Sequence, residues 1–105
     1  MNRMTKDPFA QLQAESAQNR LAFIKTELAL CFTFSNIAAR KYETGSQESA
    51  SKSMANAEKA YETVIQLLSD PKHSRRLTGE ESQDITAELE RLRERLDGLI
   101  RKFRK

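Results

Sequence analysis

Apolar residues recur at alternating spacings of three and four along three long segments of the chain. This alternation is the a/d stripe of a seven-residue repeat, which places the apolar side chains on one face of a helix. It predicts three helices that pack at shallow angles. The three stripes are Leu21, Ile24, Leu28, Cys31, Ser35, Ala38 and Tyr42; Ala50, Met54, Ala57, Tyr61, Val64 and Leu68; and Ile85, Leu89, Leu92, Leu96, Leu99 and Phe103.

Residues that start and stop helices bound the first segment. Asp7 and Pro8 are typical of an N-cap and of the first residue of a helix. The next glycine is Gly45, which suits the left-handed residue that ends a helix, and Ser46 is placed to cap the following one. We therefore predict the first helix over residues 8–43.

Similar signals bound the other two segments. The pair Asp70-Pro71 closes the second segment, because the residue before a proline avoids helical geometry. Thr78, followed three residues later by Glu81, has the pattern of a capping box. The expected helices cover residues 47–69 and 79–103.

The lengths of the connections predict the topology. The turn at Gly45 is too short for any arrangement but an antiparallel pair. The connection over 70–79 reaches about 35 Å when fully stretched, so a parallel return along a helix of that length would leave it taut. We expect a single domain over residues 8–105, an all-α antiparallel (up-down-up) three-helix bundle. A disordered N-terminus over residues 1–7 precedes it, and the long first helix overhangs its partners at its N-terminus.

Candidate chemistry is sparse in this sequence, which holds one histidine, one cysteine and three glycines. His73 lies in a polar stretch beside Arg75 and Arg76, and Cys31 falls on the apolar stripe, where a thiol behaves as a small hydrophobe. There is neither a helical Glu-x-x-His pattern for a di-iron site nor a glycine-rich phosphate loop. We therefore expect no catalytic residue, metal site, cofactor or small-molecule substrate, and no enzymatic activity.

The most apolar stretch of the chain is residues 21–39. Lys25 and Glu27 interrupt it and leave 12 uncharged residues from Leu28 to Ala39, whereas a membrane span needs about 20. We expect this stretch to be a buried helix of the bundle rather than a membrane span. The first residues are basic but lead into no apolar run, so a reducing, cytoplasmic location is the expectation.

A second apolar stripe on the first helix is the main functional signal. It lies about 110° round the helix from the core stripe at 100° per residue, and it either packs inside a broad core or contacts a second chain. The leading hypothesis is a small protein–protein interaction or scaffolding module that self-associates or docks a partner helix. The stripe consists of Phe23, Leu30, Phe34 and Ile37.

The alternative hypothesis concerns charge. The chain has 18 basic and 15 acidic residues, and the predicted topology brings seven basic residues to one end of the bundle. Phosphate contacts of that number would give salt-sensitive binding to a nucleic acid or another polyanion. The sorting of acidic residues to the start and basic residues to the end of the third helix also has a structural explanation in the helix dipole. The seven are Arg40, Lys41, Lys52, Arg101, Lys102, Arg104 and Lys105.

Overall fold

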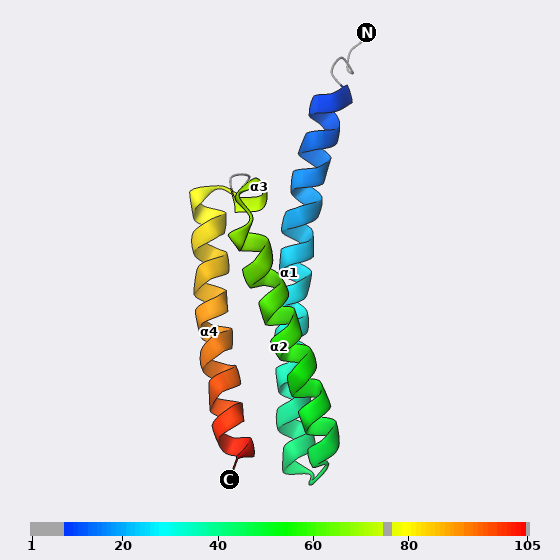
Figure 1. Ribbon diagram of the computed structural model, residues 1–105, viewed down its shortest axis with the longest axis vertical. Coiled ribbons are helices and arrows are strands. Elements are labelled where there is room, and N and C mark those ends of the chain that lie inside the picture. The colour runs from blue at the N-terminus through cyan, green and yellow to red at the C-terminus, as the bar shows by residue number, and fades with distance from the viewer. Residues whose placement is uncertain (1–7, 75–76, 105) are drawn as a thin grey trace.

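The structure is a computed structural model that describes the backbone of residues 8–74 and 77–104 and the side chains of residues 19–72 and 77–104. Three long helices, α1 (Pro8–Glu43), α2 (Gln47–Ser69) and α4 (Gly79–Phe103), pass up and down along one axis (Figure 1). The predicted all-α antiparallel three-helix bundle is confirmed, and the long helices have the expected bounds. The expectation of disorder over residues 1–7 lies outside the described residues.

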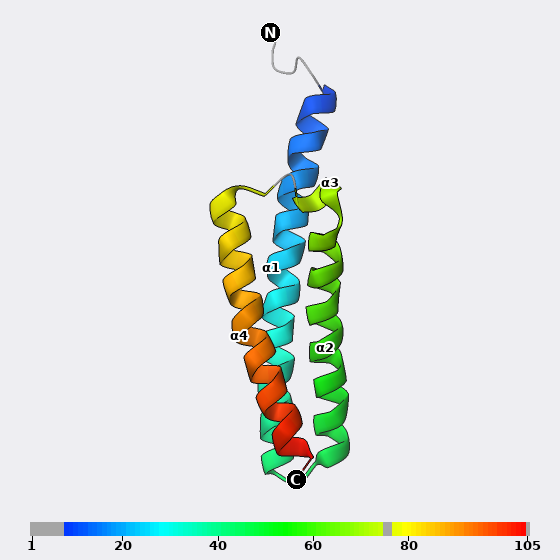
Figure 2. The same ribbon diagram turned by 60° about the vertical axis from the view of Figure 1, so that its left-hand side comes forward.

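The molecule is elongated, with extents of 64 × 22 × 18 Å. The 36 residues of α1 span about 54 Å at 1.5 Å per residue, well beyond the 23-residue α2. Figures 1 and 2 show the N-terminal part of α1 projecting past the ends of α2 and α4. The predicted overhang of the first helix is therefore present.

The core follows the three predicted stripes, and α1 packs most closely with α2. Ala60 is buried although it lies outside the predicted stripe of α2, and it belongs to the same core cluster as the stripe residues. Ser35 is the one buried polar residue among the described side chains. The buried residues are Ile24, Leu28, Cys31, Ser35, Ala38, Ala50, Met54, Ala57, Ala60, Val64, Ile85, Leu89, Leu92, Leu96 and Leu99.

The turn between α1 and α2 is built around Gly45, whose φ of 86° lies in the left-handed region that glycine tolerates. The backbone N–H of Ser46 donates to the carbonyl of Lys41 at 2.8 Å, which satisfies one of the last carbonyls of α1. Ser46 occupies the N-cap position of α2, but its side chain makes no capping hydrogen bond. The expected cap is absent because the backbone of Ser46, with ψ at 70°, departs from the extended geometry that capping needs.

The connection between α2 and α4 differs from the loop expected over residues 70–79, because it contains the short helix α3 (Pro71–Ser74). Asp70 explains the difference: its Oδ1 accepts a hydrogen bond at 2.9 Å from the backbone N–H of Lys72, and a proline suits the first position of a helix. The capping box at the start of α4 is confirmed, since the Glu81 N–H donates to Thr78 Oγ1 at 3.0 Å and the Thr78 N–H donates to Glu81 Oε1 at 2.9 Å.

Two arginines attach α4 to the other helices. Arg93 donates two hydrogen bonds of 2.9 Å to the Glu58 carboxylate of α2, and its guanidinium lies 5.0 Å from the ring centre of Tyr61. Arg95 reaches α1, where its Nε donates to the buried Ser35 Oγ at 2.9 Å and its Nη2 donates to Asn36. Both contacts place the polar groups of α4 beside the core rather than inside it.

The C-terminal end of α4 packs on the C-terminal end of α1. The rings of Tyr42 and Phe103 stack with their centroids 4.6 Å apart, and the Tyr42 hydroxyl donates to the carbonyl of Lys102 at 3.0 Å. The ammonium of Lys102 lies 3.6 Å from the Glu43 carboxylate. These contacts hold the two basic helix ends next to each other.

Candidate interaction surface

The surface of α1 that points away from α2 and α4 carries no charged residue over four turns. We call it the outer face of α1. Its members lie within about 100° of one another round the helix, at 100° per residue, and all but the half-buried Ile37 are exposed. The outer face consists of Ala22, Phe23, Thr26, Leu30, Thr33 and Ile37.

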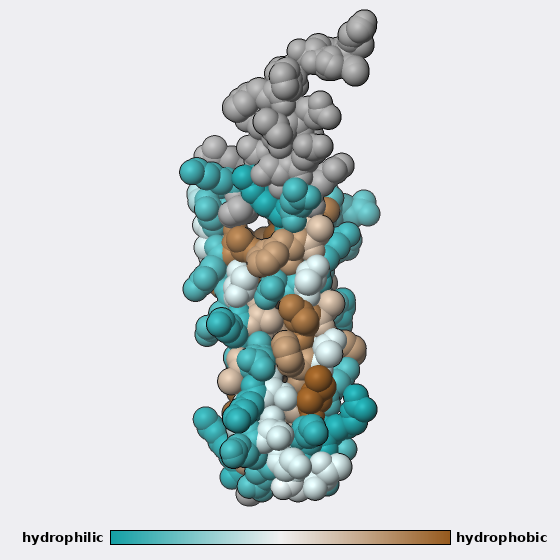
Figure 3. All heavy atoms as spheres, turned by 90° about the vertical axis from the view of Figure 1, so that its right-hand side faces the viewer, coloured by the Kyte–Doolittle hydropathy of each residue, from teal (hydrophilic) through white to brown (hydrophobic). Residues whose placement is uncertain are grey.

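The predicted second stripe is split by the structure between this surface and the core. Phe23 and Leu30 are 48% and 38% exposed, and Ile37 is half-buried at the C-terminal end of the same face. Phe34 instead packs against the core cluster. Figure 3 shows a band of apolar side chains running along the long axis over α1 and α2, with hydrophilic side chains on both sides.

The corresponding surface of α4 has the opposite character. Its exposed residues from Glu90 to Lys102 are all charged, which is the normal state of the solvent side of a helix in a bundle. Charged residues occupy successive turns there, among them Glu90, Arg91, Glu94, Asp97 and Arg101. The outer face of α1 therefore differs from the solvent-exposed surface of α4, which is charged over the same number of turns.

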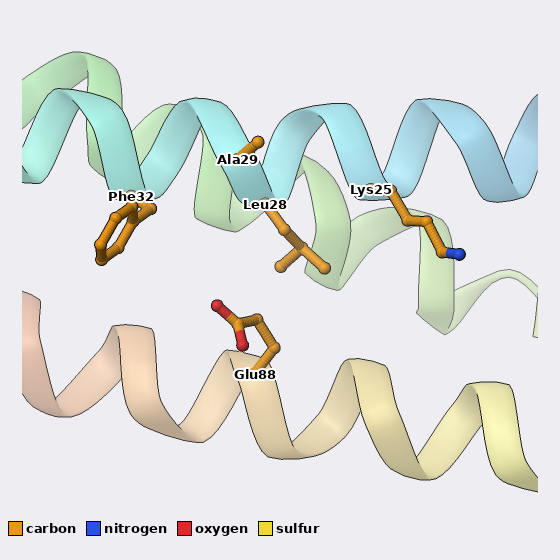
Figure 4. A pocket seen from close by; sticks show the side chains of 5 residues that line it. All are labelled: Lys25, Leu28, Ala29, Phe32 and Glu88. Carbon is orange, nitrogen blue, oxygen red and sulfur yellow. The ribbon is translucent and has the colours of Figure 1, made fainter.

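A shallow cavity lies between α1 and α4. Its volume is about 360 Å³, and it is lined by Lys25, Leu28, Ala29, Phe32 and Glu88 (Figure 4). Phe32 is 49% exposed and was not among the candidate residues, because it lies on the opposite flank of the core stripe from Phe23. In the sequence, Phe32 stands out only as an apolar residue outside the core stripe. Single apolar residues are common on protein surfaces, so this pattern alone does not indicate a site.

The basic residues of the alternative hypothesis gather at one end of the bundle, where α1 ends, α2 begins and α4 ends (Figures 1 and 2). A depression of about 410 Å³ at this end is lined by Ile37, Arg40, Lys41 and Thr44. Lys102 is paired with Glu43, so its charge is partly offset. Lys105 lies outside the described residues. The others are exposed: Arg40, Lys41, Lys52, Arg101, Lys102 and Arg104.

The described residues contain no group of three or more histidine, cysteine, aspartate or glutamate side chains that could hold a metal ion. Cys31 is fully buried, and burial raises the pKa of its thiol to about 11, so the thiolate that nucleophilic chemistry requires is disfavoured. The side chain of His73 lies outside the described residues.

By length and composition, residues Asn19–Glu43 of α1 could cross a membrane. The same segment supplies Ile24, Leu28, Cys31 and Ala38 to the core of the bundle. Packing of the bundle core therefore accounts for part of the apolar character of this segment. The apolar residues that the core does not bury include those of the outer face.

Comparisons with models of known families, with curated proteins and with solved structures found no match.

Proposed function

We propose that this protein is a small, non-enzymatic protein–protein interaction or scaffolding module that works through the outer face of α1. The observation that carries the proposal is the exposure of Phe23 and Leu30 on a helix surface that has no charged residue over four turns. Exposed apolar side chains clustered on one face are typical of contact surfaces between proteins.

The expected mode of contact is the packing of a helix along this face. Apolar anchors at spacings of seven residues, as at Phe23, Leu30 and Ile37, are what a docked helix recognises. Burying a fully exposed side chain of this size contributes about 1.5–3 kcal/mol. Phe23 and Leu30 are 48% and 38% exposed, so each contributes about half of that or less, and several anchors must act together. Phe34, the remaining member of the predicted stripe, packs against the core cluster and is not an anchor.

The proposal is tested by photo-crosslinking from the outer face. A benzophenone amino acid replaces Thr26 in one sample and Asn56, which is exposed on α2, in a matched control. Each purified chain is irradiated in an extract of cells that naturally make the protein. We expect a defined adduct from position 26 and none from position 56. Equal labelling from both positions, or no adduct from either, would show that the outer face is not a contact surface.

A second candidate function is the binding of a nucleic acid or another polyanion at the basic end of the bundle. The observation that favours it is the exposure of Arg40, Lys41, Lys52, Arg101 and Arg104 at helix ends that lie side by side. Phosphate contacts release counterions, so such binding weakens steeply as salt is raised. The pairing of Lys102 with Glu43 lowers the charge available there.

A further inference from the structure

We infer that the partner of the outer face is a second copy of this chain, packed antiparallel on α1 with Leu30 at the twofold axis. The inference rests on the proposed function and names the partner of the same surface. Four features of the outer face support it: its neutrality, its shape, the position of the basic residues and the area it offers.

Neutrality makes the outer face compatible with itself. In a twofold contact each surface meets its own copy, so a charged residue near the axis would meet a like charge. Between Ala22 and Ile37 the outer face contains no charged side chain. Lys25 and Glu27 lie on the flanks of α1, about 100° from the centre of the face at 100° per residue.

The shape of the face suits the close approach of a second helix. Ala22, Thr26 and Thr33 are small and lie along one side of the face, whereas Phe23 and Leu30 stand along the other. Small residues let two helix axes come within about 8–10 Å, and large neighbours then fill the space beside the line of contact. A pairing centred on Leu30 sets Phe23 of one copy beside the partner's Ile37.

The basic residues determine the direction of the pairing. Arg40 and Lys41 end the outer face on the C-terminal side and line the depression there. A parallel pair would bring these residues of both copies together. In an antiparallel pair centred on Leu30, the two Arg40 residues lie about 30 Å apart along the axis, at 1.5 Å per residue. That distance exceeds the screening length of about 8 Å at physiological salt, so the two Arg40 residues no longer repel each other. Arg20 lies level with the partner's Arg40, but it points about 110° away from the centre of the outer face at 100° per residue.

The exposed area indicates a weak dimer. Phe23 is 48% exposed, which for an aromatic side chain corresponds to about 100 Å². With the remaining members, the face offers roughly 400 Å² per copy, or about 800 Å² in the pair. That is below the roughly 1,200–2,000 Å² of stable interfaces and within the range of weak, transient contacts. We therefore expect dissociation in the micromolar range and exchange between monomer and dimer rather than a permanent assembly.

The test is the solution mass of the full chain by light scattering and sedimentation, over about 1–200 µM, a range that brackets micromolar dissociation. We expect a shift with concentration from 12.0 kDa toward about 24 kDa, twice the chain mass, and no change between low and moderate salt, because the contact is uncharged. A mass of 12.0 kDa throughout, or a dimer that salt disrupts, overturns the inference.

Matched substitutions locate the contact. Leu30→Glu places two carboxylates at the axis and should hold the chain at 12.0 kDa across the range. Ile65→Glu, at a residue 40% exposed on α2 against 38% for Leu30, should leave the dimer intact. Circular dichroism should give both variants the helix content of the parent. A dimer that survives Leu30→Glu, or that Ile65→Glu disrupts equally, contradicts the inference.

The position of the twofold axis has its own readout. Leu30→Cys introduces an exposed thiol beside its own copy at the axis, so mild oxidation should give a disulfide-linked dimer in high yield. The same substitution at Ile65 should not, and native Cys31 is buried in both variants. Failure of position 30 to crosslink while the chain is dimeric rules out an axis at Leu30.

Two results separate this inference from the proposed function. If the chain is monomeric and the benzophenone at position 26 captures a different protein, the outer face is a contact surface but a second copy is not its partner. The other result is a monomer that binds phosphatidylcholine vesicles in a flotation assay and loses this binding on Leu30→Glu. The partner is then a lipid surface, and both the inference and the proposed function are wrong.

Discussion

At the scale of single residues, Cys31 shows how burial suppresses the ionisation of a thiol. It is fully buried, and that burial, with a smaller contribution from the charge of Glu58, raises the pKa of the thiol from 9.0 to about 11. The folded state therefore favours the protonated thiol more than the unfolded state does. Cys31 acts as a core residue that also makes the stability of the protein depend on pH.

This dependence has a definite sign. Because the folded pKa is raised, the contribution of Cys31 to the free energy of unfolding is complete below pH 9 and is lost as the pH rises toward 11. We expect the free energy of unfolding, measured by urea titration, to fall between these pH values by up to about 2 kcal/mol more in the native chain than in Cys31→Ala. The two proteins differ only at this side chain, so identical pH profiles would mean that the buried thiol contributes nothing.

At the scale of elements, the attachment of α4 depends on side chains that lie far apart in the sequence. Arg93 contacts Glu58 and Tyr61 on α2 and also Asp97 one turn further along α4. The carboxylates raise the pKa of the Arg93 guanidinium and keep it charged. These groups are about one third exposed, so water screens their attraction and the net contribution is modest.

We expect Arg93→Gln to lower the free energy of unfolding by about 1 kcal/mol, because it removes a two-point contact between helices together with the interaction with Tyr61. Arg91→Gln is the matched control: Arg91 lies on the same helix but pairs only with Glu88 within α4 among the contacts described. Its effect should stay below about 0.5 kcal/mol. Urea titration followed by circular dichroism measures both, and equal losses would contradict a role for Arg93 in attaching α4.

The elements were predictable because their signals are local. The alternating stripes, Gly45 and the Thr78–Glu81 pair each act within a few residues, and the helices begin and end where these signals place them. The position of Phe34 was not predictable. Its stripe lies about 110° from the core stripe, at the border between core and solvent, where a small rotation of the helix decides exposure. Arg93 and Glu58 are 35 residues apart, and only the rotation of both helices brings them together.

At the scale of the whole molecule, the charge is unevenly distributed. Exposed basic residues gather where α1 and α4 end and α2 begins, although the net charge of the chain is only +3. A local cluster of one sign attracts polyanions whatever the net charge is. The same residues follow a rule of helix stability, because cations stabilise the C-terminal ends of helices.

These two roles can be separated by heparin chromatography. If the basic end binds polyanions, replacing Arg101, Lys102 and Arg104 by Gln should abolish retention at physiological salt. A control that replaces Lys59, Lys72 and Arg91 removes the same charge elsewhere and should retain most of it. Equal loss of retention in both variants would indicate a response to net charge alone. The basic residues at this end would then serve only to stabilise the ends of the helices.

The odd number of long helices has a geometric consequence. A chain that passes three times along one axis ends on the side opposite to the one where it began, and the overhang of α1 increases the separation (Figure 1). Pro8 and Phe103 therefore lie toward opposite ends of a molecule 64 Å long. Groups joined before α1 and after α4 would be held at opposite ends of the bundle. The fold would then separate them as a spacer, in addition to offering the outer face of α1 for contact.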